Sequence, residues 1–174
     1  MLTQRYTNPI DVSQADAAAI TAATVTIDFA AYSLTHPGVI AALIQRAQAG
    51  VKIRLYLDRT ELEAEARGNP QLSNSPLGPL LSTVNVQTKV KESSILMHLK
   101  SYVVDGKVLR DGSANFSPLG ESEQDNSMLL TDDGPTVELF ESKFEMMWNR
   151  TDNISPAQAI QSSARVHSAA RHSH

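Results

Sequence analysis

The sequence predicts an α/β fold, in which a mixed β-sheet is flanked by helices on both faces. A strand, a helix and a second strand over residues 24–57 predict a parallel βαβ unit. An apolar run over residues 95–104, ending at Asp105-Gly106, predicts an antiparallel hairpin whose return strand covers residues 107–110. With 174 residues, 41% of them hydrophobic, the chain is long enough for one well-buried domain.

The first half of the chain alternates between predicted helices and strands. The first helix is expected to be capped by Ser13, with Asp16 at the acidic position of the capping pattern, and to end near residue 23. Residues 24–32 then form a strand, and the second helix begins at His36-Pro37, where His36 is expected to cap or pack. Residues 51–57 alternate as the second strand of the βαβ unit.

A segment rich in Pro, Gly and Ser follows a predicted helical turn over residues 61–67 and precedes a strand over residues 84–90. We expect this segment, residues 68–82, to form a loop or lid. It is unusually apolar, which suggests packing over the sheet edge or against another subunit, or else a surface that faces lipid or gates substrate. The leucines concerned are Leu72, Leu77, Leu80 and Leu81.

Beyond the hairpin, Ser117-Pro118 is predicted to cap a short helix, and residues 127–131 to form a final buried strand. A last helix over residues 135–150 carries apolar residues at helical spacing, which indicates a stripe facing the core. The composition then changes to Ser, Ala, Gln and His. We therefore predict one domain over residues 1–150 and a mobile or loosely docked tail over residues 151–174.

Composition narrows the class of protein only slightly. The chain has no cysteine, hence no disulfide or thiolate metal site, and nothing approaches the ~20 apolar residues of a membrane span. No basic segment followed by an apolar core opens the sequence, so we expect a cytoplasmic protein, or a periplasmic or secreted one if a signal peptide has been removed. The net charge of −4 argues mildly against broad nucleic-acid affinity, although residues 89–111 hold five basic residues against three acidic ones.

One stretch holds a dense set of residues whose types suit a single reaction. His98 and Lys100 lie two apart on a predicted strand, so both side chains are expected to project from one face toward a shared anion. Gly112, Ser113 and Asn115 follow the return strand. Small residues there let the backbone approach an oxyanion, and the polar side chains donate hydrogen bonds.

Cleavage of a phosphodiester is the reaction that these residues suit. The negative phosphoryl group repels nucleophiles, so an enzyme without a metal needs cations and donors around the non-bridging oxygens. Lys100 and Asn115 meet that need, and His98 supplies a nucleophile near neutral pH and a possible general acid. Taken singly, each residue has a structural explanation, and Asp105 is fully explained by the turn.

Together the residues resemble a known signature. HLKSYVVD followed six residues later by GSAN resembles the HxK(x4)D(x6)GSxN motif of the phospholipase D superfamily. DFAAYSLTHP and GVKIRLYLD resemble its small bacterial endonuclease branch, and the likeness covers most of residues 10–150. The resemblance implies the phospholipase D/nuclease-like fold with one motif per chain.

The resemblance also implies roles by position. His98 would attack phosphorus to form a phosphohistidine intermediate, and Lys100, Ser113 and Asn115 would hold the phosphate together with His98. Asp105 would be the motif aspartate, with a structural role.

An acidic residue orients the histidine in this branch. It precedes an asparagine downstream of the GSxN segment, and here Asp125-Asn126 takes the place where Glu-Asn is more usual. Asp125 is therefore the expected orienting group, and Glu123 is the alternative.

Members of the superfamily normally place two histidines around one phosphate. This motif occurs once, so we expect a homodimer in which His98 of two chains meet at a two-fold axis. The expected function is a metal-independent phosphodiesterase without a cofactor, namely an endonuclease of low specificity acting on DNA or RNA. A phospholipase acting on anionic phospholipids is the alternative, and an inactive nucleic-acid-binding member is the second.

Overall fold

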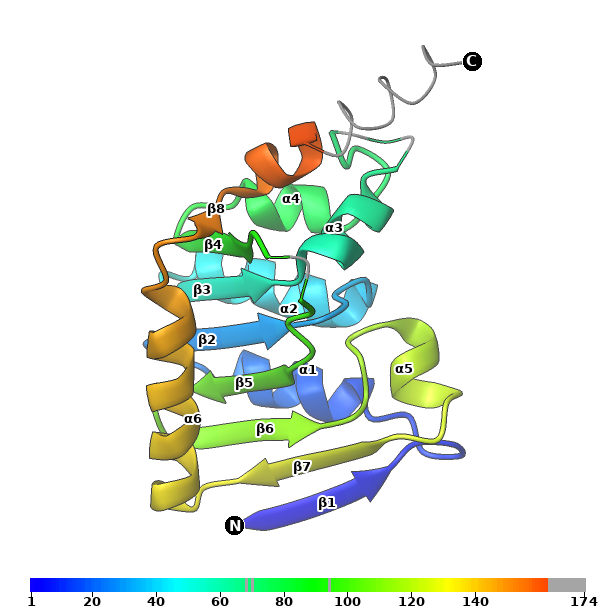
Figure 1. Cartoon of the computed structure of the whole chain (residues 1–174). Coiled ribbons are helices and arrows are strands. Elements are labelled where there is room, and N and C mark those ends of the chain that lie inside the picture. Colours follow the sequence, from blue (N-terminus) through cyan, green and yellow to red (C-terminus); the bar gives the residue numbers. More distant parts are fainter. Residues whose placement is uncertain (68, 70, 94, 163–174) are drawn as a thin grey trace.

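A computed structural model describes residues 1–67, 69, 71–93 and 95–162. Its centre is one mixed eight-stranded sheet (Figure 1). The strand order is β1 (Leu2–Tyr6), β7 (Ser127–Thr131), β6 (Val108–Gly112), β5 (Lys100–Val104), β2 (Thr26–Ala31), β3 (Lys52–Leu57), β4 (Val86–Lys91) and β8 (Asn153–Ile154). Strands β2, β3 and β4 are parallel and all other pairs are antiparallel. The predicted mixed sheet is therefore confirmed.

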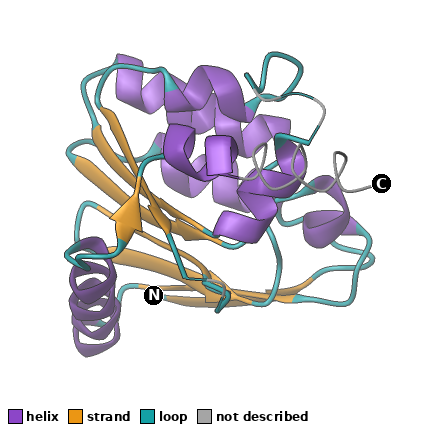
Figure 2. Cartoon of the chain, turned by 45° about the horizontal axis from the view of Figure 1, so that its top comes forward, coloured by secondary structure: helices purple, strands orange, loops and turns teal. Residues whose placement is uncertain are grey.

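Helices cover both faces of this sheet, as predicted (Figure 2). They are α1 (Ser13–Thr21), α2 (Pro37–Gln48), α3 (Arg59–Glu65), α4 (Leu77–Leu81), α5 (Pro118–Ser122) and α6 (Gly134–Trp148). Helix α6 packs its buried stripe of Val137, Phe140, Phe144, Met147 and Trp148 on one face, and α1, α2 and α4 build a larger core on the other. None of the helices in the described part of the chain has the length and apolar character that a bilayer crossing requires.

The βαβ unit formed by β2, α2 and β3 agrees with the sequence. His36 caps α2, because its Nδ1 accepts hydrogen bonds from the backbone N–H groups of Gly38 and Val39. Ser117 likewise caps α5 by accepting from the N–H of Gly120. The capping prediction for α1 is wrong, since Val12 is the N-cap without a side-chain bond and Asp16 is buried for another reason given below.

The motif hairpin begins later than predicted. Strand β5 starts at Lys100, so His98 lies in the segment that leads into it. Hydrogen bonds from side chains, rather than pairing with a neighbouring strand, fix that segment. Asp58 accepts from the N–H of Met97 at 2.7 Å, and Lys91 donates to the carbonyl of Ile95 at 2.6 Å. The turn itself is confirmed, because Asp105 and Gly106 both have positive φ, at 52° and 62°.

Three segments differ from the sequence prediction. The segment 68–82 includes α4, and its Leu72, Leu77 and Leu80 are buried in the core, so the lipid-facing interpretation is wrong. Strands β1 and β8 were not expected; they form the two edges of the sheet, and β8 follows β7 in the sequence, so β7 is not the last strand. The predicted loose tail is wrong for residues 153–162, where Ala159 is fully buried, and residues 163–174 lie outside the described residues.

Candidate active site

The two halves of the motif meet at one end of the sheet. Lys100 begins β5, His98 lies two residues before it, and Asn115 follows the end of β6. Because β5 and β6 are antiparallel neighbours, the start of β5 and the end of β6 lie at the same end of the sheet. The carboxyl ends of β2 and β3 lie at this end of the sheet too, as the pairing of Ala31 with Lys100 shows.

Tyr32, directly after β2, is the common neighbour of the histidine and the lysine. Its ring meets the His98 ring edge-on at a centroid separation of 4.5 Å, and the Lys100 Nζ lies 4.7 Å from its centre. Lys100 Nζ also donates to the carbonyl of His98 at 2.8 Å. His98 lies outside the strand on which it was expected, but both side chains contact the Tyr32 ring, with His98 exposed and Lys100 only 5% exposed.

Two acidic residues that follow β3, Asp58 and Glu61, lie near Lys100, and neither was predicted as a site residue from the sequence. Burial lowers the pKa of Lys100, while the nearby carboxylates of Glu61 and Asp58 act to raise it. Burial and the charge of Glu61 likewise raise the pKa of the Tyr32 phenol. Their only sequence signal is Asp58 at the start of a helix, where its carboxylate accepts from the N–H groups of Thr60 and Glu61.

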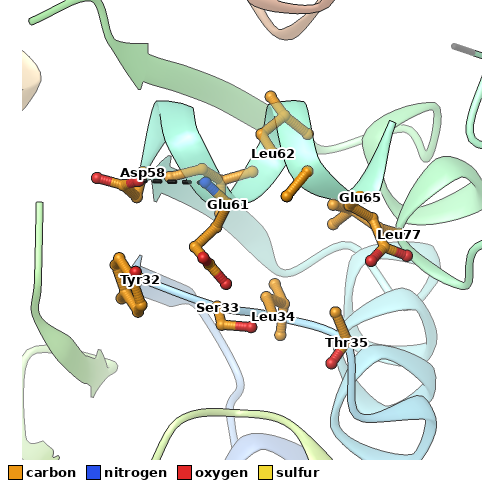
Figure 3. Close-up of a pocket in the computed structure, with 11 residues that line it drawn as sticks. Tyr32, Ser33, Leu34, Thr35, Asp58, Glu61, Leu62, Glu65 and Leu77 are labelled. Carbon is orange, nitrogen blue, oxygen red and sulfur yellow. Dashed lines mark hydrogen bonds between the residues drawn. The ribbon is translucent and has the colours of Figure 1, made fainter. Parts of the chain in front are cut away.

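A cavity of about 190 Å³ opens beside Tyr32, between α3 and the segment after β2. Figure 3 shows the Glu61 side chain pointing into this space from α3, with Ser33 and Thr35 on the opposite wall. Glu61 and Glu65 both line the cavity, so it has room beside Tyr32 for a group that bears hydroxyls or other donors.

The GSAN segment is shaped by its contact with β7. A Cβ on Gly112 would lie 2.2 Å from the carbonyl oxygen of Ser127, and its φ of 149° is one that other residues rarely adopt. Gly112 therefore serves strand packing, whereas small residues here were expected to admit an oxyanion. Ser113 Oγ accepts from the N–H of Ser127 at 2.9 Å and donates to Asn126 Oδ1 at 3.1 Å.

Asn115 is half-buried, and its Oδ1 is buried without a hydrogen-bond partner among the described residues. This oxygen can only accept a hydrogen bond, so a phosphate oxygen would have to be bound by the Nδ2 amide group of Asn115 instead. The position of Asn115 directly after β6 brings it to the same end of the sheet as Lys100.

Asp105 lies at the opposite end of β5 from His98. Its carboxylate accepts from the N–H groups of Thr24, Val25 and Thr26 and from the Thr24 hydroxyl, at 2.7–2.9 Å. These bonds outweigh the effect of partial burial and hold its pKa at about 2. The motif aspartate thus anchors the start of β2, as its expected structural role requires, and does not reach the phosphate site.

Asp125 and Glu123 are both exposed. Asp125 accepts from Asn8 Nδ2 at 3.3 Å, and no hydrogen bond joins either carboxylate to His98 in the described structure. The role of Asp125 in orienting His98 stays a prediction.

Beneath the site lies a buried polar cluster that sequence analysis also missed. Arg110 and Asp16 form an ion pair at 3.0 Å, both side chains fully buried, and the Tyr102 hydroxyl donates to Asp16 at 2.8 Å. Glu121 is buried beside them, and its burial, reinforced by the charge of Asp16, raises its pKa to about 8. Spacing offered no signal for this cluster, because its members come from four elements.

The fold and this arrangement of histidine, lysine and asparagine define a phospholipase D-like domain. A family model described as "Cardiolipin synthase, PLD-like domain" matches residues 17–148, and the chain belongs to this family. It is thus a member of the phospholipase D superfamily of phosphodiesterases, as the motif predicts.

Relatives by sequence include mitochondrial cardiolipin hydrolases. The protein of that name from Xenopus tropicalis is 29% identical over 129 residues, covering 74% of this chain and 57% of that protein. The one from Homo sapiens is 27% identical over 132 residues, covering 76% and 49%. The chain therefore spans about half the length of these relatives.

Solved structures show the same fold. NucT from Helicobacter pylori superimposes with a TM-score of 0.72 at 20% identity, covering 89% of this chain and 99% of that one. Nuc from Salmonella typhimurium, a phospholipase D family member, gives 0.70 at 19% identity, covering 88% and 97%.

Proposed function

We propose that the protein is a metal-independent phosphodiesterase that cleaves DNA as an endonuclease of low sequence specificity. The main support for this proposal is that His98 and Lys100 both contact the Tyr32 ring, at the end of the sheet where Asn115 also lies. The domain match and the likeness to Nuc and NucT along nearly their whole length support a phosphodiesterase catalytic unit.

The proposed reaction has two displacements at phosphorus. An imidazole nitrogen of His98 attacks and forms a P–N bond, while the bond to the leaving oxygen breaks and that oxygen takes a proton from His98 of the partner subunit. The same partner group then removes a proton from water, which attacks phosphorus and releases His98. Lys100 balances the charge on the non-bridging oxygens in both steps, and Asn115 Nδ2 donates a hydrogen bond to them.

Cleavage of plasmid and single-stranded DNA in excess EDTA tests this proposal. His98→Ala and Lys100→Ala should lower the rate by a factor on the order of 10³ or more, because each removes a group that acts in the transition state. Lys107→Ala is the matched control, since Lys107 is an exposed lysine on the turn at the far end of the same hairpin. Wild-type protein that leaves DNA intact, or a His98→Ala variant that still cleaves it, would refute the proposal.

Hydrolysis of anionic phospholipids is a second candidate, favoured by the names of the sequence relatives. Ile95 and Leu96, which precede His98, are exposed apolar residues that could contact lipid. Comparing release of headgroup from cardiolipin vesicles with cleavage of DNA by the same preparation distinguishes the two. Preferential turnover of the vesicles would replace DNA by lipid as the substrate.

A further inference from the structure

Arg110 joins the two halves of the phosphate site from below. Its side chain, on β6, is fully buried, and its Nη1 donates to the carbonyl oxygen of Lys100 at 2.6 Å and to that of Ala114 at 3.1 Å. Ala114 lies between Ser113 and Asn115. One guanidinium nitrogen therefore binds the backbone of the lysine and the backbone next to the asparagine.

Asp16, on α1, fixes the direction in which this nitrogen points. Its carboxylate accepts from Arg110 Nε at 3.1 Å and from Nη2 at 3.0 Å, a bidentate pair that leaves Nη1 free for the two carbonyls. Tyr102 donates to the same carboxylate, and the ring of Phe116 covers the guanidinium at 4.4 Å. Because the guanidinium is planar, these contacts restrict its rotation as well as its position.

We propose that Arg110, oriented by Asp16, is a positioning residue that sets the separation of Lys100 and Asn115 and hence the width of the phosphate site. This rests on the proposed function. A fully buried ion pair is a poor source of stability, because desolvation of the charges offsets their attraction. An apolar pair in place of Arg110 and Asp16 could pack as well, but it could not bind the carbonyls of Lys100 and Ala114. Those bonds matter for position, since a displacement of about 1 Å in a catalytic group can lower the rate by about 10².

Two variants separate positioning from stability. Arg110→Lys keeps the charge, but one ammonium cannot bind Asp16 bidentately and bridge both carbonyls. The double variant Asp16→Leu/Arg110→Met removes both charges together, so that neither is left buried and unpaired. Arg54→Met is the matched control, because Arg54 on β3 pairs with Asp28 and Glu145 and bonds neither half of the motif.

Each protein is assayed on bis(p-nitrophenyl) phosphate well below its melting temperature, with thermal unfolding measured in parallel. We expect kcat to fall about 10²-fold in both site variants, with a smaller change in KM, because displaced ligands lose most in the transition state. Arg54→Met should lose stability and keep its kcat.

The outcomes are distinguishable. A folded Arg110→Lys or double variant with wild-type kcat overturns the inference, as does an equal loss of kcat in Arg54→Met. If wild type hydrolyses no diester, or His98→Ala matches it, the proposed function fails first and the inference fails with it.

Discussion

Glu121 is a buried carboxyl group whose two oxygens have no hydrogen-bond partner in the described part of the chain. The charged groups around it are Asp16 on α1, Asp11 just before that helix and Arg110 on β6, with the Tyr102 hydroxyl on β5. Since Arg110 is already paired with Asp16, a second carboxylate there would be unbalanced. Glu121 is therefore protonated near neutral pH, with its pKa raised to about 8 chiefly by burial.

The Glu121 carboxyl group should make the folded protein less stable as pH rises. Between the ordinary pKa of 4.5 and the folded value of about 8, the unfolded chain has released the Glu121 proton while the folded protein retains it. The free energy of unfolding therefore decreases as pH rises, by up to about 1.4 kcal/mol per unit for this group. Glu121→Gln cannot titrate, so its stability relative to wild type should increase from pH 4.5 to pH 8 and then level off. Urea unfolding across that range measures the difference, and a difference that does not change with pH would contradict the assignment.

The residues of the site were predictable to different degrees. His98, Lys100 and Asn115 were predicted from their types and spacing, and the fold brings these three residues to one end of the sheet, while their roles stay predictions. Asp16 could not be recognised as buried, since three residues after Ser13 it fits a helix cap equally well. Its partner Arg110 is 94 positions away, and only the folded chain brings them together.

The segment between β4 and β5 depends on Asp58 for its shape. The same carboxylate caps α3 and binds the N–H of Met97, one residue before His98. Asp58→Ala removes the cap and leaves a buried N–H unsatisfied, so we expect unfolding free energy to fall by about 1–3 kcal/mol. Because His98 would lose its support, kcat should fall about tenfold or more.

Asp133→Ala is the control for that variant. Asp133 caps α6 through the N–H of Thr136, on the opposite face of the sheet, and is exposed. It should lose about 1 kcal/mol of stability and keep its kcat. Denaturant unfolding and initial rates on the two proteins decide the matter. Equal kcat in both would show that Asp58 only stabilises α3.

Elements with strong local signals were predicted well, and those that depend on distant partners were not. α2 and α6 have apolar residues at helical spacing and side-chain caps, and they occur where the pattern places them. β1 has the sequence LTQRY with mostly exposed side chains, and it is a strand because it pairs with β7 far along the chain. The start of β5 was misplaced because Asp58, 39 residues from Met97, holds the preceding segment away from the ladder.

At the scale of the whole molecule, one chain supplies one motif histidine. His36 is engaged as the cap of α2, and His98 is the other histidine among the described residues. Ile95, in the segment that leads to His98, is an apolar side chain that is 74% exposed. If the reaction needs a second histidine at the phosphate, a second copy of the chain would supply it, and the dimer stays a prediction.

A mixing experiment tests the proposed dimer through its chemistry. Wild type and His98→Ala are unfolded together, refolded so that subunits associate at random, and assayed at constant total protein. If one phosphate needs His98 from both chains, only wild-type pairs are active, and the rate should follow the square of the wild-type fraction. A half-and-half mixture should then retain about a quarter of the activity, whereas chains that act alone would retain about half. Sedimentation of the same samples should give twice the mass of one 18.9 kDa chain, and a linear decline with a monomer mass would exclude the shared site.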